Sequence, residues 1–152
     1  EAVGAGDSTL AKAYERDALT MIPTKSKLMP HAREVLEYLS RKYNLYILSN
    51  GFKELQSHKM RSSGIDEYFK KVVLSDDIGI LKPWPEIFHF ALSTTQSELN
   101  NSLMIGDSWE NDIVGAAGVG MHQVFYNLSG RIDLPFAPTY QITDLKDLFN
   151  FL

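Results

Sequence analysis

Two carboxylates follow a short apolar run in the C-terminal half of the sequence. The run 103–105 stops at Gly106, and Asp107 and Asp112 come after it. This order is typical of a strand that delivers side chains to the rim of an open α/β sheet, where such sheets bind ligands. Carboxylate oxygens are the ligands that Mg²⁺ prefers, so the two acids indicate a candidate magnesium site. The alternative is that they cap a helix beginning nearby.

Two other polar features stand where a phosphate group could bind. The turn Ser49-Asn50-Gly51 follows the apolar run 45–48, and its hydroxyl and backbone N–H groups can hold phosphate oxygens. An ordinary turn with a helix cap is the alternative for this tripeptide. Lys82 offers a compact cation that can neutralise a phosphoryl group or order neighbouring carboxylates. A solvated surface charge is the alternative for the lysine.

The pattern of the chain predicts the elements that position these side chains. Continuous apolar runs predict strands, and apolar positions at helical spacing predict the helices between them. The expected strands are 45–48, 72–74, 103–105, 123–126 and a weaker 140–142, and the expected helices are 7–22, 30–42, 52–63, one starting after Lys82-Pro83-Trp84-Pro85, 110–117 and one from 144. This alternation predicts a parallel sheet. All strands of such a sheet end at one edge, so we expect Ser49, Lys82 and Asp107 to converge on one ligand.

The composition limits the classes of function. The 152 residues are 44% hydrophobic and suit one compact core. A net charge of −4 without a basic cluster argues against binding to a nucleic-acid polymer. The sequence contains no cysteine, which excludes disulfides and thiolate metal sites and favours a cytoplasmic protein. No apolar stretch approaches the roughly 18 residues that a membrane span needs, so we expect a soluble protein with no membrane partner.

The three polar features, in this order, resemble the conserved motifs of the haloacid dehalogenase (HAD) superfamily. Leu48-Ser49-Asn50-Gly51 is similar to the second motif, Lys82-Pro83 to the third, and the stretch 106–112 to the fourth. The resemblance runs from about Met29 to Tyr126. It implies a Rossmann-like α/β core and, for most members, a Mg²⁺-dependent phosphatase that acts on a small phosphorylated metabolite.

The resemblance also implies a role for each site residue. Asp107 is expected to bind Mg²⁺, and Asp112 either holds a metal-bound water or pairs with Lys82. Ser49 and the N–H groups of Asn50 and Gly51 are expected to hold the phosphate. Lys82 is expected to balance charge around the nucleophile.

The fourth motif favours phosphate-ester hydrolysis over dehalogenation. Dehalogenating members need no metal and tend not to keep the Gly-Asp pair, whereas this sequence has it at Gly106-Asp107. Asn50-Gly51-Phe52 followed by Glu54-Leu55-Gln56 is most similar to the bacterial pyrimidine-type 5′-nucleotidases. A metal-independent 2-haloacid dehalogenase stays the enzymatic alternative.

One family motif is absent from the 152 residues. Family enzymes form an aspartyl phosphate on an Asp-x-Asp-x-Thr motif, which lies on a central first strand and precedes a helical cap, and no such motif occurs here. We therefore expect residues 1–24 to be the C-terminal part of the cap and residues 25–152 to be a core without its first central strand. The chain is then an inactive fragment of a phosphatase, or a non-catalytic binding or assembly module. The absent central strand would leave a gap in the sheet. We expect this gap to be filled by an N-terminal segment, closed by the two strands beside it, or filled by another chain.

The remaining aromatic and histidine residues give weaker signals. Trp84 and Trp109 lie beside the motifs. Both could line the cleft and stack on a base or pack against the cap, and the alternative is packing in the core or at the cap interface. The four histidines share no ligand-like spacing, so we assign them no metal.

Overall fold

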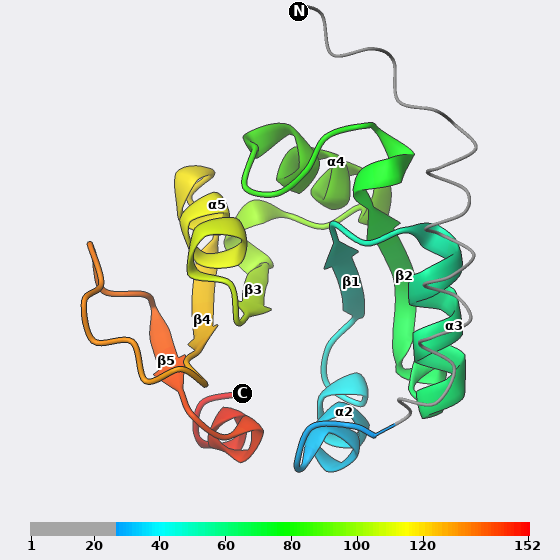
Figure 1. Ribbon diagram of the computed structural model, residues 1–152, viewed down its shortest axis with the longest axis horizontal. Coiled ribbons are helices and arrows are strands. Elements are labelled where there is room, and N and C mark those ends of the chain that lie inside the picture. The colour runs from blue at the N-terminus through cyan, green and yellow to red at the C-terminus, as the bar shows by residue number, and fades with distance from the viewer. Residues whose placement is uncertain (1–26) are drawn as a thin grey trace, which may run out of the picture.

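The computed structural model describes residues 27–152, so the predicted cap segment 1–24 and the predicted helix 7–22 lie outside the described part. Helices separate its first four strands, and a loop without a helix leads from the fourth strand to the fifth (Figure 1). The strands are β1 (Leu45–Ser49), β2 (Phe69–Leu74), β3 (Leu103–Gly106), β4 (His122–Tyr126) and β5 (Tyr140–Ile142), and the α-helices are α2 (Ala32–Ser40), α3 (Lys53–Ser63), α4 (Pro85–Thr95) and α5 (Gly115–Gly118). The α/β architecture predicted from the sequence is confirmed.

The strands form two parallel sheets. β1 pairs with β2, and β4 lies between β3 and β5. In residues 27–152, β1 pairs with no strand other than β2 and β3 with none other than β4, so each of these two strands has one unpaired edge. Figure 1 shows the two sheets on opposite sides of the middle of the molecule. Among the ways in which the predicted gap could be filled, closure by its flanking strands is therefore excluded for this structure.

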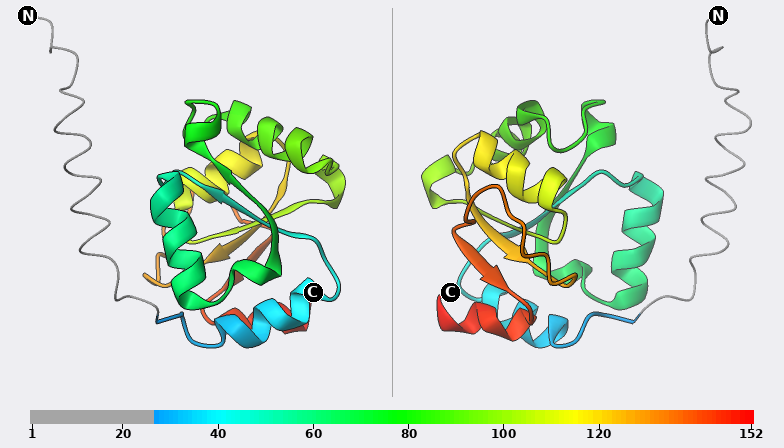
Figure 2. Two further views of the ribbon diagram at one scale, coloured as in Figure 1. Left: turned by 90° about the vertical axis from the view of Figure 1, so that its right-hand side faces the viewer. Right: turned by 60° about the vertical axis from the view of Figure 1, so that its left-hand side comes forward.

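The hydrophobic clusters nevertheless join the two sheets into one layer. On one face, Leu48 of β1 and Met104 of β3 pack against a cluster that includes Phe88 of α4 and Ala116 of α5. On the other face, Leu45 of β1 and Leu103 and Ile105 of β3 pack against α2, β4 and the C-terminal helix (Leu145–Asn150). Successive strand residues point to opposite faces, so both strands contribute to both clusters. Figure 2 shows helices on both sides of the strands.

The strands beside the gap are less buried than the strand that has neighbours on both sides. Every residue of β1 and of β3 is only partly buried, although the apolar run of β1 predicted a strand covered on both faces. In β4, by contrast, Val124 is fully buried and Phe125 almost so. An inner strand is shielded at both of its edges, whereas β1 and β3 each have one edge open toward the gap, and their residues are partly exposed.

Several helix boundaries differ from the sequence predictions for local reasons. The helix expected from Pro30 begins at Ala32, after His31 in a left-handed conformation. The helix expected at 110–117 starts with the π-helical turn Trp109–Val114, in which Ile113 N donates to Ser108 O, and only then becomes α5. The last helix, Leu145–Asn150, is a 3₁₀-helix capped by Asp144. No helix in the described part of the chain is both long and apolar enough to cross a bilayer.

Candidate active site

Lys82 lies where β1 of one sheet and β3 of the other reach their carboxyl ends. Its Nζ donates to the carbonyl oxygen of Leu48, the penultimate residue of β1, at 2.8 Å. The same Nζ lies 2.6 Å from Oδ1 of Asp112, in the turn that follows β3. The Lys82 and Asp112 side chains are only 10% and 7% exposed. One ammonium group therefore connects the ends of the two strands that flank the gap.

Asn50 holds the loop of Lys82 against the end of β1. Its side-chain Oδ1 accepts from the Lys82 N–H at 2.7 Å, and its Nδ2 donates to the Lys82 carbonyl oxygen at 3.0 Å. Both the oxygen and the nitrogen of the Asn50 side-chain amide are thus hydrogen-bonded to the backbone of Lys82. These contacts bring the Ser49-Asn50-Gly51 turn, Lys82 and Asp112 together at one edge, while the binding of one shared ligand, with Asp107, stays a prediction.

Asp112 is held in place by Lys82 and by the backbone of its own turn. Oδ2 accepts from the Ser108 N–H at 3.1 Å, while Oδ1 faces Lys82. The carboxylate folds back over Gly106, where a Cβ would lie within about 2.5 Å of the Asp112 side chain. Of the two expected roles of Asp112, the structure shows the pairing with Lys82. Gly106 is a glycine because any larger residue would occupy the place of this carboxylate.

Asp107 is the acid that remains available for a cation. It follows the last residue of β3, its side chain is exposed, and it forms no ion pair or side-chain hydrogen bond with another residue of 27–152. Residues 27–152 contain no cluster of three His, Cys, Asp or Glu residues able to hold a metal. Mg²⁺ is commonly held by one or two carboxylates together with substrate phosphate and water. The exposed carboxylate of Asp107 fits one position of such a site, and its binding of Mg²⁺ stays a prediction.

The Ser49 hydroxyl accepts two hydrogen bonds. The Gly51 N–H donates to Ser49 Oγ at 3.0 Å, and Nε2 of Gln56 donates to it at 2.6 Å. The Gly51 N–H, expected to hold phosphate, is therefore engaged by Ser49 in this structure. Sequence reasoning used Gln56 only to compare subfamilies and gave it no role in the site. Its position in the first turns of α3, directly after the polar turn, was the available signal.

The electrostatics near the fourth motif include a second, exposed ion pair. Glu110 Oε1 lies 2.7 Å from Arg131 Nη1. The hydrogen bond from Arg131 lowers the pKa of Glu110 below its ordinary value of 4.5, with smaller contributions from the backbone and from the charge of Arg131. This pair fastens the loop after β4 to the turn after β3.

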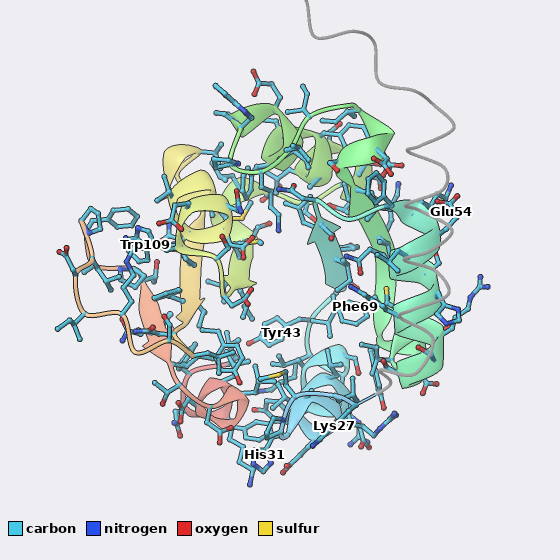
Figure 3. All side chains as sticks on the ribbon, viewed as in Figure 1. Lys27, His31, Tyr43, Glu54, Phe69 and Trp109 are labelled. Carbon is cyan, nitrogen blue, oxygen red and sulfur yellow. The ribbon has the colours of Figure 1, made fainter. Side chains whose placement is uncertain are left out.

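The two tryptophans have different environments. Trp109 is 3% exposed and packs edge-on against Phe125, with Phe136 and Arg131 also against its ring. In Figure 3 it lies beside β4 and the loop that follows, away from β1. Cleft lining is thus the wrong alternative for Trp109, because β4 and its loop cover the indole. Trp84 is 65% exposed, next to the Lys82 loop.

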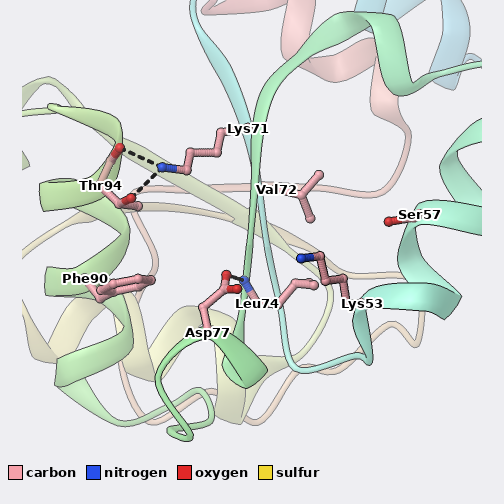
Figure 4. A pocket seen from close by; sticks show the side chains of 8 residues that line it. All are labelled: Lys53, Ser57, Lys71, Val72, Leu74, Asp77, Phe90 and Thr94. Carbon is pink, nitrogen blue, oxygen red and sulfur yellow. Dashed lines mark hydrogen bonds between the residues drawn. The ribbon is translucent and has the colours of Figure 1, made fainter.

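A cavity of about 410 Å³ lies apart from these residues, between α3, β2 and α4 (Figure 4). Lys71 reaches across it and donates to the carbonyl and hydroxyl oxygens of Thr94. None of the residues that line the cavity belongs to the Ser49, Lys82 and Asp112 cluster. This cavity is therefore not part of the candidate active site.

Comparison with known proteins gives the same family as the motifs. The family model of haloacid dehalogenase-like hydrolases matches residues 1–120. YfnB of Bacillus subtilis, whose name describes a HAD-hydrolase, is 31% identical over 128 residues, which are 83% of this chain and 54% of YfnB. The pyrimidine 5′-nucleotidase YjjG of Escherichia coli is 31% identical over 82% of this chain and 56% of its own length. The chain thus spans about half the length of these curated relatives.

Solved structures show the same fold. The crystal structure of YfnB bound to magnesium superimposes with a TM-score of 0.83 and 30% identity, over 97% of this chain and 63% of that one. A 2-haloacid dehalogenase from Pseudomonas syringae superimposes with a TM-score of 0.73 and 29% identity, over 82% of this chain and 52% of that one. The fold is therefore shared with a protein named a HAD-hydrolase and with one named a 2-haloacid dehalogenase.

Proposed function

Because the chain belongs to the haloacid dehalogenase-like hydrolases, we propose that it forms the phosphate-binding and magnesium-binding part of a phosphomonoester hydrolase. The observation that carries the proposal is the buried contact of Lys82 with Asp112 and with the carbonyl of Leu48, at the edge where the Ser49 turn ends. A buried cation between two strand ends is suited to a doubly charged phosphate group.

Each site residue has a separate task in this proposal. The Ser49 hydroxyl, with the N–H group of Asn50, holds the phosphate oxygens, while the Gly51 N–H donates to Ser49 Oγ. Lys82 neutralises their charge, and Asp112 keeps the ammonium group in position. Asp107 holds Mg²⁺, which when bound stabilises the negative charge that develops on the phosphoryl oxygens.

The nucleophile is proposed to come from an extended segment between β1 and β3. The unpaired edges and partial burial of these strands support this proposal. A parallel strand in the gap would end beside Lys82, because all strands of a parallel sheet end at the same edge. An aspartate there attacks phosphorus, the ester P–O bond breaks, and the leaving oxygen takes a proton from a second carboxyl group. Water then hydrolyses the aspartyl phosphate. An N-terminal segment or another chain can supply this strand.

The proposed substrate is a small phosphorylated metabolite, and a nucleoside 5′-monophosphate is the more specific candidate. The similarity to YjjG, which is named a pyrimidine 5′-nucleotidase, supports the specific candidate. The likeness to a dehalogenase keeps metal-independent dehalogenation as the rival reaction, and Asp107 argues against it. The alternative to any enzymatic function is a non-catalytic binding or assembly module. The cysteine-free sequence favours a cytoplasmic location, which stays a prediction.

Binding of inorganic phosphate to the 152-residue chain tests the proposal. In buffer with MgCl₂ we expect saturable one-to-one binding by calorimetry, weakened about tenfold or more in Lys82→Ala because a charge-assisted hydrogen bond is lost. Lys146→Ala, which removes an exposed lysine from the C-terminal helix, is the matched control and should bind as the parent chain does. Circular dichroism checks that both variants fold. Absence of phosphate binding, or equal binding by Lys82→Ala, would contradict the proposal.

A further inference from the structure

We infer that Gln56 is a positioning residue that fixes the Ser49 hydroxyl as a hydrogen-bond donor to an incoming phosphate oxygen. This inference rests on the proposed function. It concerns a residue of α3 that lies outside the three polar turns.

The hydrogen bonds at Ser49 determine the direction of its hydroxyl proton. A serine hydroxyl has two acceptor lone pairs and one donor. The Gly51 N–H and the Gln56 Nε2 occupy both acceptor positions, at 3.0 and 2.6 Å. Among residues 27–152 no acceptor takes the Ser49 proton. The proton must therefore point away from both donors and can be donated to an anionic oxygen. Because both lone pairs are occupied, Ser49 Oγ cannot coordinate a cation.

The geometry of α3 explains how Gln56 reaches this hydroxyl. Side chains on a helix lean toward its N-terminus, so a residue in the first turns can contact the segment that precedes the helix. Gln56 lies in this region, and its backbone N–H bonds to the carbonyl of Phe52, the residue just before α3. Its amide thus reaches back over the turn to Ser49. There the Ser49 hydroxyl meets the N–H groups of the Gln56 side chain and of the Gly51 backbone.

Gly51 makes this contact possible. A Cβ at position 51 would lie 2.4 Å from Gln56 Nε2 and 3.1 Å from Cγ and Cδ of the same side chain. The backbone of Gly51 is not in the left-handed region, so alanine is allowed there by its conformation. Alanine at this position would therefore displace the Gln56 amide while leaving the backbone intact. Glycine is needed here because of Gln56.

The test measures phosphate affinity in a double-mutant cycle in the 152-residue chain with MgCl₂. We expect Gln56→Leu to weaken inorganic phosphate binding about tenfold, as for the loss of one oriented hydrogen bond to a charged group. Gln56→Glu should weaken it further, because its carboxylate accepts the Ser49 proton. Gly51→Ala should behave as Gln56→Leu does. Gln141→Leu, at an exposed position on β5, is the matched control and should change nothing.

The cycle separates positioning from a general loss of structure. If Gln56 acts through Ser49, the double variant Ser49→Ala/Gln56→Leu should bind phosphate no more weakly than Ser49→Ala alone. In ¹H–¹⁵N spectra the side-chain amide signal of Gln56 should shift in Ser49→Ala and again when phosphate is added to the parent chain. Equal phosphate affinity of Gln56→Leu and the parent chain, or effects of the two single variants that multiply, would overturn the inference. Lack of phosphate binding by the parent chain would instead overturn the proposed function, and with it this inference.

Discussion

Lys82 Nζ lies 2.6 Å from Asp112 Oδ1, and the two side chains are almost fully buried. The two residues belong to loops that leave different sheets, so their ion pair closes the edge of a gap that no strand in residues 27–152 fills. The pair therefore has both a chemical and a structural consequence. It keeps a cation at the candidate phosphate site, and it holds β1 and β3 at a fixed separation.

Removing one partner of this pair should destabilise the chain strongly. Asp112→Ala leaves the buried Lys82 ammonium without its counter-ion, which typically costs about 3–5 kcal/mol of unfolding free energy. Glu37→Ala is the matched control, because it breaks the exposed pair of Glu37 with Arg41 and should cost less than about 1 kcal/mol. Urea unfolding followed by circular dichroism measures both. Equal losses in the two variants would show that burial of the Lys82 pair has no energetic consequence.

Gly106 is predicted to be required for the position of Asp112. In Gly106→Ala the new methyl group overlaps the Asp112 carboxylate, so the ion pair must move, at a cost of about 1–3 kcal/mol. Gly118→Ala is the control, since a Cβ there meets nothing within 4 Å and alanine favours the helix. Thermal unfolding should show a lower Tm for Gly106→Ala and an equal or higher Tm for Gly118→Ala. The reverse order would contradict the assigned role of Gly106.

The Glu110 and Arg131 pair should produce a measurable pH effect. The hydrogen bond from Arg131 holds the pKa of Glu110 below 4.5, so the pair favours the folded chain at pH values above 4.5. That contribution is lost as the pH falls through the lowered pKa of Glu110 in the folded chain. Side-chain carboxyl NMR titration should show the lowered pKa, and Arg131→Ala should return it toward 4.5. An unchanged Glu110 pKa in that variant would contradict the contact.

The two tryptophans should respond differently to substitution and to a quencher. Trp109→Ala opens a cavity beside Phe125 and should cost about 3–5 kcal/mol of unfolding free energy, whereas the exposed Trp84→Ala should stay within about 0.5 kcal/mol. Acrylamide should quench the fluorescence of Trp84 in a Trp109→Phe variant far more than that of Trp109 in a Trp84→Phe variant. Similar quenching of the two would contradict the burial of Trp109.

The sequence was sufficient to predict the contacts that follow from parallel topology. Ser49, Lys82 and the turn after β3 come together because the carboxyl ends of parallel strands share an edge, and each strand was visible as an apolar run. The position of Gln56 just after the polar turn is visible in the sequence, but its contact with Ser49 depends on the backward lean of a helical side chain over Gly51, which only the structure shows. The sequence could not assign Trp109 either, because core and cleft tryptophans have the same local sequence. The π-helical turn at Trp109–Val114, which accompanies the folding of Asp112 back onto Gly106, also differs from the helix expected at 110–117.

The most direct test of the account is the rate of phosphomonoester hydrolysis by the purified 152-residue chain with Mg²⁺. The rate is measured alone and with a peptide that carries an apolar strand ending in Asp-x-Asp-x-Thr. We predict background hydrolysis by the chain alone, a saturable increase with the peptide, and no increase when Lys82→Ala replaces the parent chain. Hydrolysis by the chain alone at a normal enzymatic rate, on the order of 10 s⁻¹, would contradict the claim that the nucleophile comes from a strand between β1 and β3.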